Sequence, residues 1–224
     1  MNNKAMFKLS YGLFVLTAQD GSKDNGCITN TAIQVTTEPN QISVAVNKLN
    51  FTHDMILNTK KFNVSILGED ASFETFKHFG FQSGRNIDKF ADYTDMTRSE
   101  NGIYYITAGT NAFISAEVSK IVDLGTHTLF IASVTDMEVL SDARSATYEY
   151  YQSNIKPKPA KQEGTGSGKV VWRCKVCGYI YDPEKGDPAA GLPAGLDLDN
   201  LPSGFSFACP LCKHPASDFE KITL

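Results

Sequence analysis

The 224-residue chain has little that would direct a protein to nucleic acid or into a membrane. Lysine and arginine total 21 against 25 aspartates and glutamates, giving a formal net charge of −4. Without a basic excess, we expect no nucleic-acid partner. No apolar run approaches the roughly 20 residues that a membrane-spanning helix needs. The opening residues also lack the continuous apolar stretch of a signal peptide, so we expect neither membrane insertion nor secretion.

Cysteine is scarce as well, and its spacing is more informative than its number. Four of the five cysteines form two Cys-x-x-Cys pairs, Cys174 with Cys177 and Cys209 with Cys212. Two thiolates at this spacing lie on one tight turn, and two such turns close a tetrahedral four-sulfur site that suits iron or zinc. Disulfides or idle thiols are the plainer alternative. This use of cysteine fits a reducing cytoplasm.

The residues around these pairs favour iron. The pattern Cys-x-x-Cys-Gly-Tyr-x-Tyr-Asp-Pro-x-x-Gly-Asp-Pro over 174–188, with Cys-Pro-x-Cys over 209–212, resembles rubredoxin across residues 169–224. The resemblance implies one iron, cycling between ferric and ferrous, held by Cys174, Cys177, Cys209 and Cys212. It also implies a small core made by Trp172, Tyr179, Tyr181, Phe207 and Phe219. Two departures are visible, because Phe207 stands where rubredoxins usually carry tryptophan and the stretch between the inner cysteines is slightly long. A zinc ribbon, as a structural or binding module, is the alternative.

A stretch with almost no apolar side chains precedes this region. Residues 155–168 are rich in proline, glycine and lysine, which predicts a flexible linker with a typical span of about 20 Å. Its glycines lack the spacing and the preceding strand of a nucleotide-binding fingerprint. We therefore expect a first domain over 1–154, a linker over 155–168 and a rubredoxin domain over 169–224.

The first domain has the pattern of a mainly β protein with short helices. Alternating or continuous apolar stretches predict strands at 11–18, 27–37, 42–47, 62–67, 103–105, 112–123 and 127–140. The turn formers at 19–26 predict a hairpin tip, and the polar residues 80–101 a long loop. Helices are expected at 51–59, capped by Thr52, and around Phe73, Phe76 and Phe79. Strands in this number, with two short helices, in roughly 150 residues predict a β-barrel with helices over its ends.

An ordered set of motifs in this domain resembles the flavin reductase-like, FMN-binding split barrel. The motifs, in chain order, are Gly26-Cys-Ile-Thr-Asn-Thr-Ala32, Val35-Thr36 with Pro39, Val44-Ala-Val46, Thr52-His53 and Phe62-Asn-Val-Ser-Ile-Leu67. The resemblance covers about residues 5–140, with Ile28 in the usual threonine position. It implies FMN as cofactor, NAD(P)H as donor without a Rossmann domain, and a homodimer with flavin sites near the interface. A flavin also suits the rubredoxin, because it converts hydride into the single electrons that one iron accepts.

Two segments are expected to hold the FMN. Backbone amides and side chains of Cys27–Thr31 are placed to bond the isoalloxazine edge, while Lys48 and the helix start at Thr52 suit the phosphate. The expected contacts are Gly26, Cys27, Ile28, Thr29, Asn30, Thr31, Asn47, Lys48 and Thr52. Packing for Cys27, a solvated surface for Lys48 and ordinary turn or cap roles for Asn30 and Thr52 are the alternatives. Hydride transfer requires positioning and charge stabilisation, so no catalytic residue is expected.

The fusion of the two domains resembles the high-molecular-weight rubredoxins of anaerobic bacteria. The resemblance implies a cytoplasmic oxidoreductase in which NAD(P)H reduces FMN, FMN reduces the rubredoxin iron, and a flavodiiron protein accepts the electrons to reduce nitric oxide or dioxygen. Two alternatives stay open. One is a free-flavin reductase that releases reduced FMN. The other is a flavin-binding protein with a structural zinc ribbon.

Overall fold

The structure is a computed structural model that describes residues 5, 8–157, 169–175, 179–188, 191–205, 207–210 and 215–223. The chain divides after Pro157 into a larger and a smaller unit, each of which is described by itself. Most of the expected linker, residues 158–168, lies outside the described residues, so its flexibility stays a prediction. Within the described ranges, no helix is long and apolar enough to cross a membrane.

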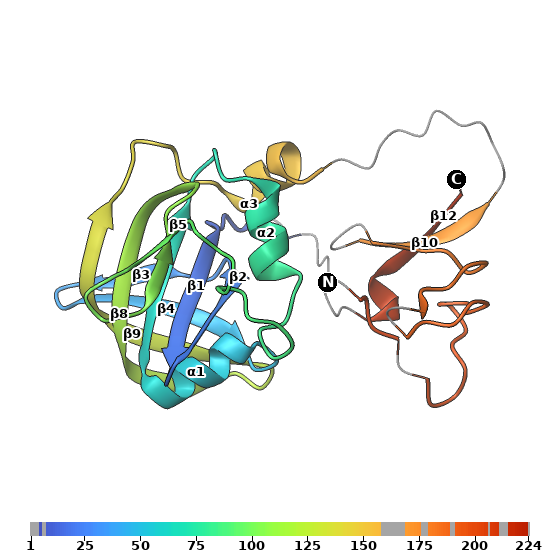
Figure 1. Cartoon of the computed structure of the whole chain (residues 1–224), viewed down its shortest axis with the longest axis horizontal. Coiled ribbons are helices and arrows are strands. Elements are labelled where there is room, and N and C mark those ends of the chain that lie inside the picture. The colour runs from blue at the N-terminus through green and yellow to red at the C-terminus, as the bar shows by residue number, and fades with distance from the viewer. Residues whose placement is uncertain are drawn as a thin grey trace. The chain divides into compact units, whose positions relative to one another are not determined.

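Seven antiparallel strands form the main sheet of the larger unit, in the order β2-β1-β5-β8-β9-β4-β3. They are β1 (Phe14–Asp20), β2 (Lys23–Thr29), β3 (Ile33–Thr37), β4 (Asn40–Asn47), β5 (Lys61–Leu67), β8 (Thr110–Asp123) and β9 (His127–Val139). A flat sheet of this size would separate its edges by about 29 Å. Only residues 30–32 join edge strands β2 and β3, and such a link reaches at most about 14 Å. The sheet therefore curls into a split barrel (Figure 1).

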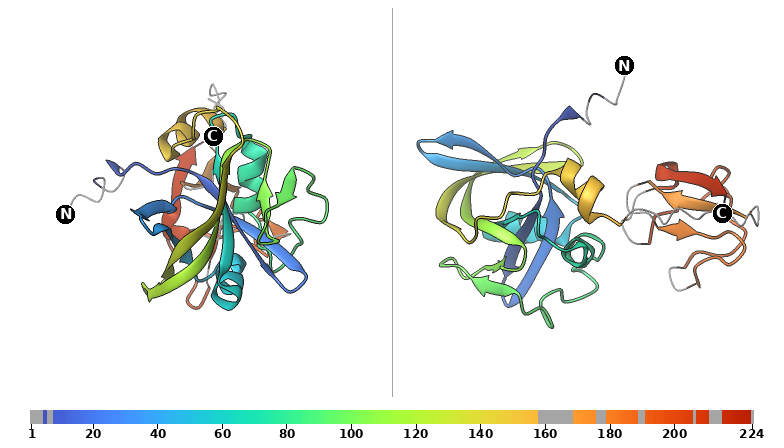
Figure 2. Two further views of the ribbon diagram at one scale, coloured as in Figure 1. Left: turned by 90° about the vertical axis from the view of Figure 1, so that its left-hand side faces the viewer. Right: turned by 90° about the horizontal axis from the view of Figure 1, so that it is seen from above.

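Two helices and a short hairpin complete the barrel. Helix α1 (Phe51–Thr59) crosses one end of the sheet, and α2 (Phe73–Gly80) stands beside β1 and β2 (Figure 1). The remaining elements are the hairpin β6 (Met96–Arg98) and β7 (Tyr104–Ile106), α3 (Tyr148–Tyr150) and the π-helical turn η2 (Tyr151–Ile155). The β3–β4 hairpin, drawn in blue, projects beyond the rest of the unit (Figures 1 and 2).

Alternation along β1 divides the apolar side chains between two cores. Leu16 belongs to the barrel interior, together with Met55 and Ile56 from α1. Val15 points to the opposite face and packs with Phe76 and Phe79 of α2. Successive strand residues face opposite sides of a sheet, so one strand serves both cores. The mainly β barrel with short helices that the sequence predicts is confirmed.

Four details of the sequence interpretation were wrong. Helix α1 has the expected bounds, but its N-cap is Asn50, and Thr52 is its second residue, fully buried. The turn between β1 and β2 occupies only residues 21–22, so most of the expected tip at 19–26 is strand. The expected strand 27–37 is divided into the end of β2 and all of β3, and the expected loop 80–101 ends in β6. Hydrogen bonds to side chains far along the sequence explain the first two differences: Thr52 bonds Asn25, and Arg98 bonds Asp24.

The smaller unit is a three-stranded sheet over an aromatic core. Its strands run in the order β11-β10-β12. The elements are β10 (Val170–Cys174), β11 (Ile180–Tyr181), the 3-10 turn η4 (Ala216–Asp218) and β12 (Phe219–Thr223). The expected core is confirmed, since Trp172, Tyr181, Phe207 and Phe219 are buried together and Tyr179 packs against them. The rings of Phe207 and Phe219 meet edge to face, with centroids 5.0 Å apart, a favourable aromatic geometry.

Candidate flavin and iron sites

Strand β2 lies at an edge of the sheet, and its register decides which backbone groups can reach a ligand. Asp20 pairs with Lys23 across the two-residue turn, so every second pair along the hairpin is hydrogen-bonded. This alternation directs the backbone groups of Gly26 and Ile28 away from β1. Consistently, the Gly26 carbonyl accepts a hydrogen bond from the Lys89 ammonium at 2.8 Å. The backbone of Ile28 lies on the same free edge.

The side chains at the start of the expected flavin segment are committed to packing. A Cβ on Gly26 would lie 3.0 Å from the ring of Phe79, so close contact with α2 explains the glycine. Cys27 belongs to the barrel core, and burial raises the pKa of its thiol. Ile28 packs on the α2 side, next to Gly80. An apolar residue therefore suits position 28 better than threonine does.

Residues 29–31 carry the chain from one sheet edge to the other. The Thr31 hydroxyl donates to the Ala45 carbonyl at 2.8 Å and accepts from the Ala45 N–H at 3.1 Å. It also lies 2.9 Å from the hydroxyl of Thr29. The half-buried Asn30 lies between these two threonines. Thr31 thus fastens the crossing segment to β4. The side chain of Asn30, in contrast, makes no hydrogen bond to another described residue.

The loop between β4 and α1 leaves a helix start open to an anion. The Asn47 side chain accepts from the Leu49 N–H at 2.9 Å and so shapes the loop. The N-cap residue Asn50 makes no side-chain capping hydrogen bond, which leaves N–H groups of the first turn available to a ligand. Lys48 is engaged elsewhere, because its ammonium lies 2.7 Å from the Asp123 carboxylate. This ion pair lowers the pKa of Asp123.

A buried polar cluster joins the two expected flavin segments. The Thr52 hydroxyl accepts from the Asn25 side-chain amide at 2.9 Å. Against the larger effect of burial, it also acts to lower the pKa of the Cys27 thiol. The hydrogen bond to Asn25 explains why Thr52 does not cap its helix. The side-chain oxygen of Asn25 has no hydrogen-bond partner within the described structure. The structure therefore brings Gly26, Cys27 and Thr52 together, while Lys48 forms an ion pair with Asp123 at the end of β8.

Lys89 is the residue of this region that sequence reasoning missed. Its side chain is buried, and its ammonium donates to the carbonyls of Gly26 and Phe79 at 2.8 and 2.9 Å. The Lys89 carbonyl in turn lies 2.6 Å from a ring nitrogen of His78. Both acceptors of the ammonium are backbone atoms, and a lysine in a polar loop carries no sequence signal of burial.

The smaller unit places one cysteine from each expected pair in the same core. Cys174 ends β10 and Cys209 follows the bridge between Ala208 and Pro215, with 1% and 0% of their surfaces exposed. The Cys174 N–H donates to the Tyr179 carbonyl at 2.8 Å. Cys177 and Cys212 lie outside the described residues. Two buried thiols in one core fit half of a four-sulfur iron site.

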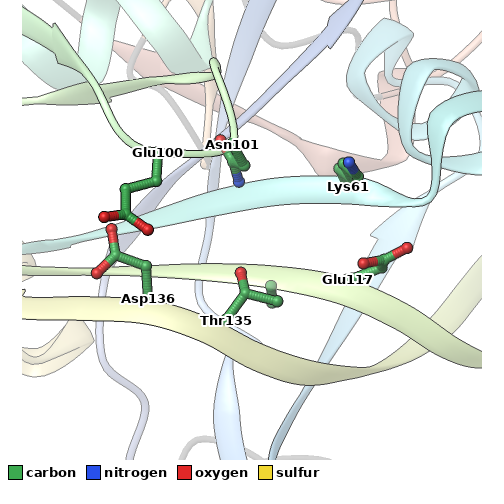
Figure 3. Close-up of a pocket in the computed structure, with 7 residues that line it drawn as sticks. Lys61, Glu100, Asn101, Glu117, Thr135 and Asp136 are labelled. Atoms are coloured by element: carbon green, nitrogen blue, oxygen red, sulfur yellow. The ribbon is translucent and has the colours of Figure 1, made fainter.

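A pocket of about 200 Å³ lies elsewhere on the barrel, between β5, β8, β9 and the turn before β7. Figure 3 shows the carboxylates of Glu100 and Asp136 directed toward one another across it, with Lys61 and Glu117 along its rim. None of the expected FMN contacts lines this pocket. Counting only residues that the structure describes, no group of three acidic, histidine or cysteine side chains is placed to hold a metal ion. The pocket therefore belongs to neither expected site.

Comparison with known proteins assigns both units. Residues 6–158 match the flavin reductase like domain, and residues 171–219 match rubredoxin. The high molecular weight rubredoxin of Moorella thermoacetica is 36% identical over 232 residues, covering 99% of this chain and all of that protein. The ferric-chelate reductase (NAD(P)H) of Archaeoglobus fulgidus is 37% identical over 158 residues, covering 70% of this chain and 93% of that protein.

Solved structures show the same barrel. The NADH:FAD oxidoreductase SgcE6 of Streptomyces globisporus superposes with a TM-score of 0.57 at 22% identity. The match covers 64% of this chain and 84% of that one, and it is evidence for the fold alone. The chain therefore belongs to the flavin reductase-like family, with a rubredoxin domain joined to its barrel, and these two domains imply FMN and one iron as its cofactors.

Proposed function

We propose that the protein oxidises NAD(P)H and passes the electrons through FMN and its rubredoxin iron to a flavodiiron protein that reduces nitric oxide or dioxygen. The observation that carries the proposal is the presence of both domains in one chain, as in the Moorella relative that matches 99% of it. When bound, FMN accepts a hydride and releases electrons singly, as a one-iron centre requires. The setting proposed is the cytoplasm of an oxygen-poor cell.

The residues of the barrel divide the work of holding FMN. The free backbone edge at Ile28 and the side chain of Asn30 bind the ring system. The open N-terminus of α1 binds the phosphate. Thr31 and Asn47 act by fixing the two loops, as their hydrogen bonds to Ala45 and Leu49 indicate. This division supports a site made largely of backbone groups.

Lys48 and the remaining residues have secondary parts in the proposed site. Lys48 would have to exchange its Asp123 partner for the phosphate. Gly26 and Cys27 set the position of β2 through their packing against α2 and the barrel core. Thr29 supports Thr31, and Thr52 joins α1 to β2 through Asn25. No side chain of this group is assigned an acid or base role.

The protein is also proposed to act as a homodimer. Ile33 and Val35 on β3 and Met137 and Val139 at the end of β9 are 45 to 74% exposed. A contact between the Asn40 amide and the Met137 sulfur, at 3.9 Å, brings the β3–β4 hairpin beside β9. Exposed apolar side chains on an unpaired sheet edge invite a protein partner.

The dimer is tested by sedimentation of the full-length chain. Val139→Lys places a charge within the proposed interface, and we expect it to shift the protein from dimer to monomer. Ile180→Lys, at an apolar position of the smaller unit that is 45% exposed against 74% for Val139, is the control and should stay dimeric. A wild-type protein that sediments as a monomer at micromolar concentration would remove the proposal.

Anaerobic stopped-flow spectroscopy tests the electron relay. NADH and NADPH are mixed separately with the oxidised protein, and the flavin and ferric–thiolate bands are followed together. We expect the flavin to bleach first and the ferric band to follow within the same turnover. Flavin bleaching with a persistent ferric band would reject the internal relay. Addition of a purified flavodiiron protein and nitric oxide should then accelerate NAD(P)H oxidation, and an unchanged rate would exclude that acceptor.

A second candidate function is reduction of an external ferric chelate by the larger unit alone. The Archaeoglobus ferric-chelate reductase favours it, because its 37% identity concerns that unit. A free-flavin reductase would behave similarly, by releasing reduced FMN. The variant Cys174→Ser distinguishes these functions from the relay. Ferric-chelate reduction should survive this substitution if the larger unit suffices, whereas electron delivery to a flavodiiron protein should be lost.

Metal analysis of the wild type tests the zinc-ribbon alternative, since zinc gives no visible band.

A further inference from the structure

Lys89 is a buried cation whose partners are neutral. Its side chain is 2% exposed, and its ammonium donates to the carbonyls of Gly26 and Phe79. None of the ion pairs formed by described residues includes Lys89. Burying a charge without a counter-ion is costly, and proteins tend to retain such charges at functional sites.

The titratable groups named here around Lys89 supply no buried negative charge. Cys27 on β2 faces it, and burial raises the pKa of that thiol, which keeps it neutral. His78 on α2 contacts the Lys89 carbonyl. Asp88 is exposed and accepts from the Phe90 N–H. Tyr93 on the same loop has its pKa raised to about 12, first by burial. The interior near Gly26 is therefore positive whenever Lys89 is protonated.

This charge lies at the segment proposed for FMN. Gly26 opens the segment, and the preceding Asn25 is hydrogen-bonded to Thr52 at the proposed phosphate end. Hydride transfer from NAD(P)H delivers two electrons and one proton to FMN, so the reduced form carries one more negative charge than the oxidised form. A buried cation interacts more strongly with that charge than an exposed one, because the interior screens it less.

We infer that Lys89 is a positioning residue of the flavin site, whose buried charge favours the reduced, anionic form of FMN over the oxidised form. The inference rests on the proposed binding of FMN at Gly26–Thr31. Burial also lowers the pKa of Lys89 to about 8. A new negative charge nearby raises that pKa again, so Lys89 takes up a proton when reduced FMN binds at a pH above about 8.

Anaerobic calorimetry with oxidised and with reduced FMN tests the inference on the full-length, FMN-depleted chain. In Lys89→Met we expect the ratio of reduced to oxidised affinity to fall roughly tenfold, the effect of one charge at a separation of about 12 Å and an effective dielectric constant of about 20. Lys77→Met is the matched control. Lys77 lies on α2, is exposed and pairs with Glu74, so its removal should leave the ratio unchanged.

The outcomes separate this inference from the proposed function. A wild-type protein that binds neither form of FMN refutes the proposed function. If the wild type binds FMN but the Lys89→Met variant keeps the same ratio of reduced to oxidised affinity, the role of Lys89 is overturned. If Lys89→Met fails to fold, proton uptake by the wild-type protein tests the inference instead. Titrations in buffers of different ionisation enthalpy at pH 8.5 should show more proton uptake with reduced than with oxidised FMN, and equal uptake overturns the inference.

Discussion

Replacing Thr52 by valine isolates the hydroxyl that joins helix α1 to β2. Thr52 is fully buried, and its hydroxyl accepts a hydrogen bond from the Asn25 side-chain amide. The Asn25 oxygen already has no hydrogen-bond partner in the described structure, so valine would leave both ends of a buried amide unpaired. An unpaired buried donor costs about 1–3 kcal/mol, and valine leaves no cavity. We expect the free energy of unfolding of the larger unit to fall by about 2 kcal/mol.

The single tryptophan makes this measurement specific. Trp172 lies in the smaller unit, so its fluorescence follows that unit, whereas far-ultraviolet circular dichroism follows the whole chain. We expect Thr52→Val to lower the dichroism midpoint by about 4–8 °C, as a loss of about 2 kcal/mol does in a unit of this size. The midpoint of the tryptophan signal should not move.

A serine variant separates the hydroxyl from the methyl group. Thr52→Ser keeps the hydrogen bonds and removes one buried methyl, at a cost of about 1 kcal/mol. The expected order of stability is wild type, serine, valine. A valine variant at least as stable as the serine variant would show that apolar packing, and not the link to Asn25, holds Thr52 in place, and the reasoning would be refuted.

Three further perturbations test other parts of the structure. Because Lys48 lowers the pKa of Asp123, their pair stabilises the fold above the ordinary carboxyl pKa and loses this effect as pH falls through the lowered value. If FMN phosphate captures Lys48, FMN should raise the pKa of Asp123 in an NMR titration, and an unchanged pKa would show that Lys48 stays. Gly26→Ala should cost about 1–3 kcal/mol in urea denaturation, because its Cβ would press on Phe79 at 3.0 Å; a neutral effect would contradict this packing. Cys209→Ser should abolish the ferric–thiolate band yet leave NADH-dependent FMN reduction intact, and a retained red colour would exclude this cysteine as a ligand.

Local periodicity was enough to predict much of the fold. Helix α1 has its expected bounds because Met55 and Ile56 form its only apolar face and both enter the barrel core. Strands β4 and β5 alternate apolar and polar residues in the sequence, and the smaller unit gathers the expected aromatics. In each case the side chains that define the pattern also make the core, so sequence and tertiary packing agree.

The start of β2 shows where such prediction fails. Asp24 and Asn25 are strong turn formers, yet both lie in the strand. Asp24 is held by Arg98, 74 residues later, at 2.8 Å, and Asn25 by Thr52, 27 residues later, at 2.9 Å. Tertiary contacts therefore override local propensity here. A single sequence contains no sign of these pairings, because each partner is an ordinary polar residue in its own segment.

The candidate site was predicted as segments, and its individual atoms were not. The motifs located Gly26–Thr31 and the start of α1, but not that Thr31 and Asn47 bind backbone groups nearby. Lys89 escaped notice for a related reason, since its acceptors are carbonyls 63 and 10 residues away. Motifs record side chains, whereas the proposed site is built mainly from backbone geometry that side chains fix from a distance.

That geometry also accounts for the isoleucine in the flavin segment. Along β2 the Cys27 side chain enters the barrel core and the Ile28 side chain packs toward α2. The side chains on both faces of this strand are thus packed against other parts of the unit, and only the free edge of the strand remains for a ligand. A strand that binds through its edge can exchange threonine for isoleucine without losing backbone hydrogen bonds, since N–H and C=O groups are the same in both residues. In the proposed site, the residues that matter most for binding are those that hold the edge in place, and Lys89 bonds the Gly26 carbonyl directly.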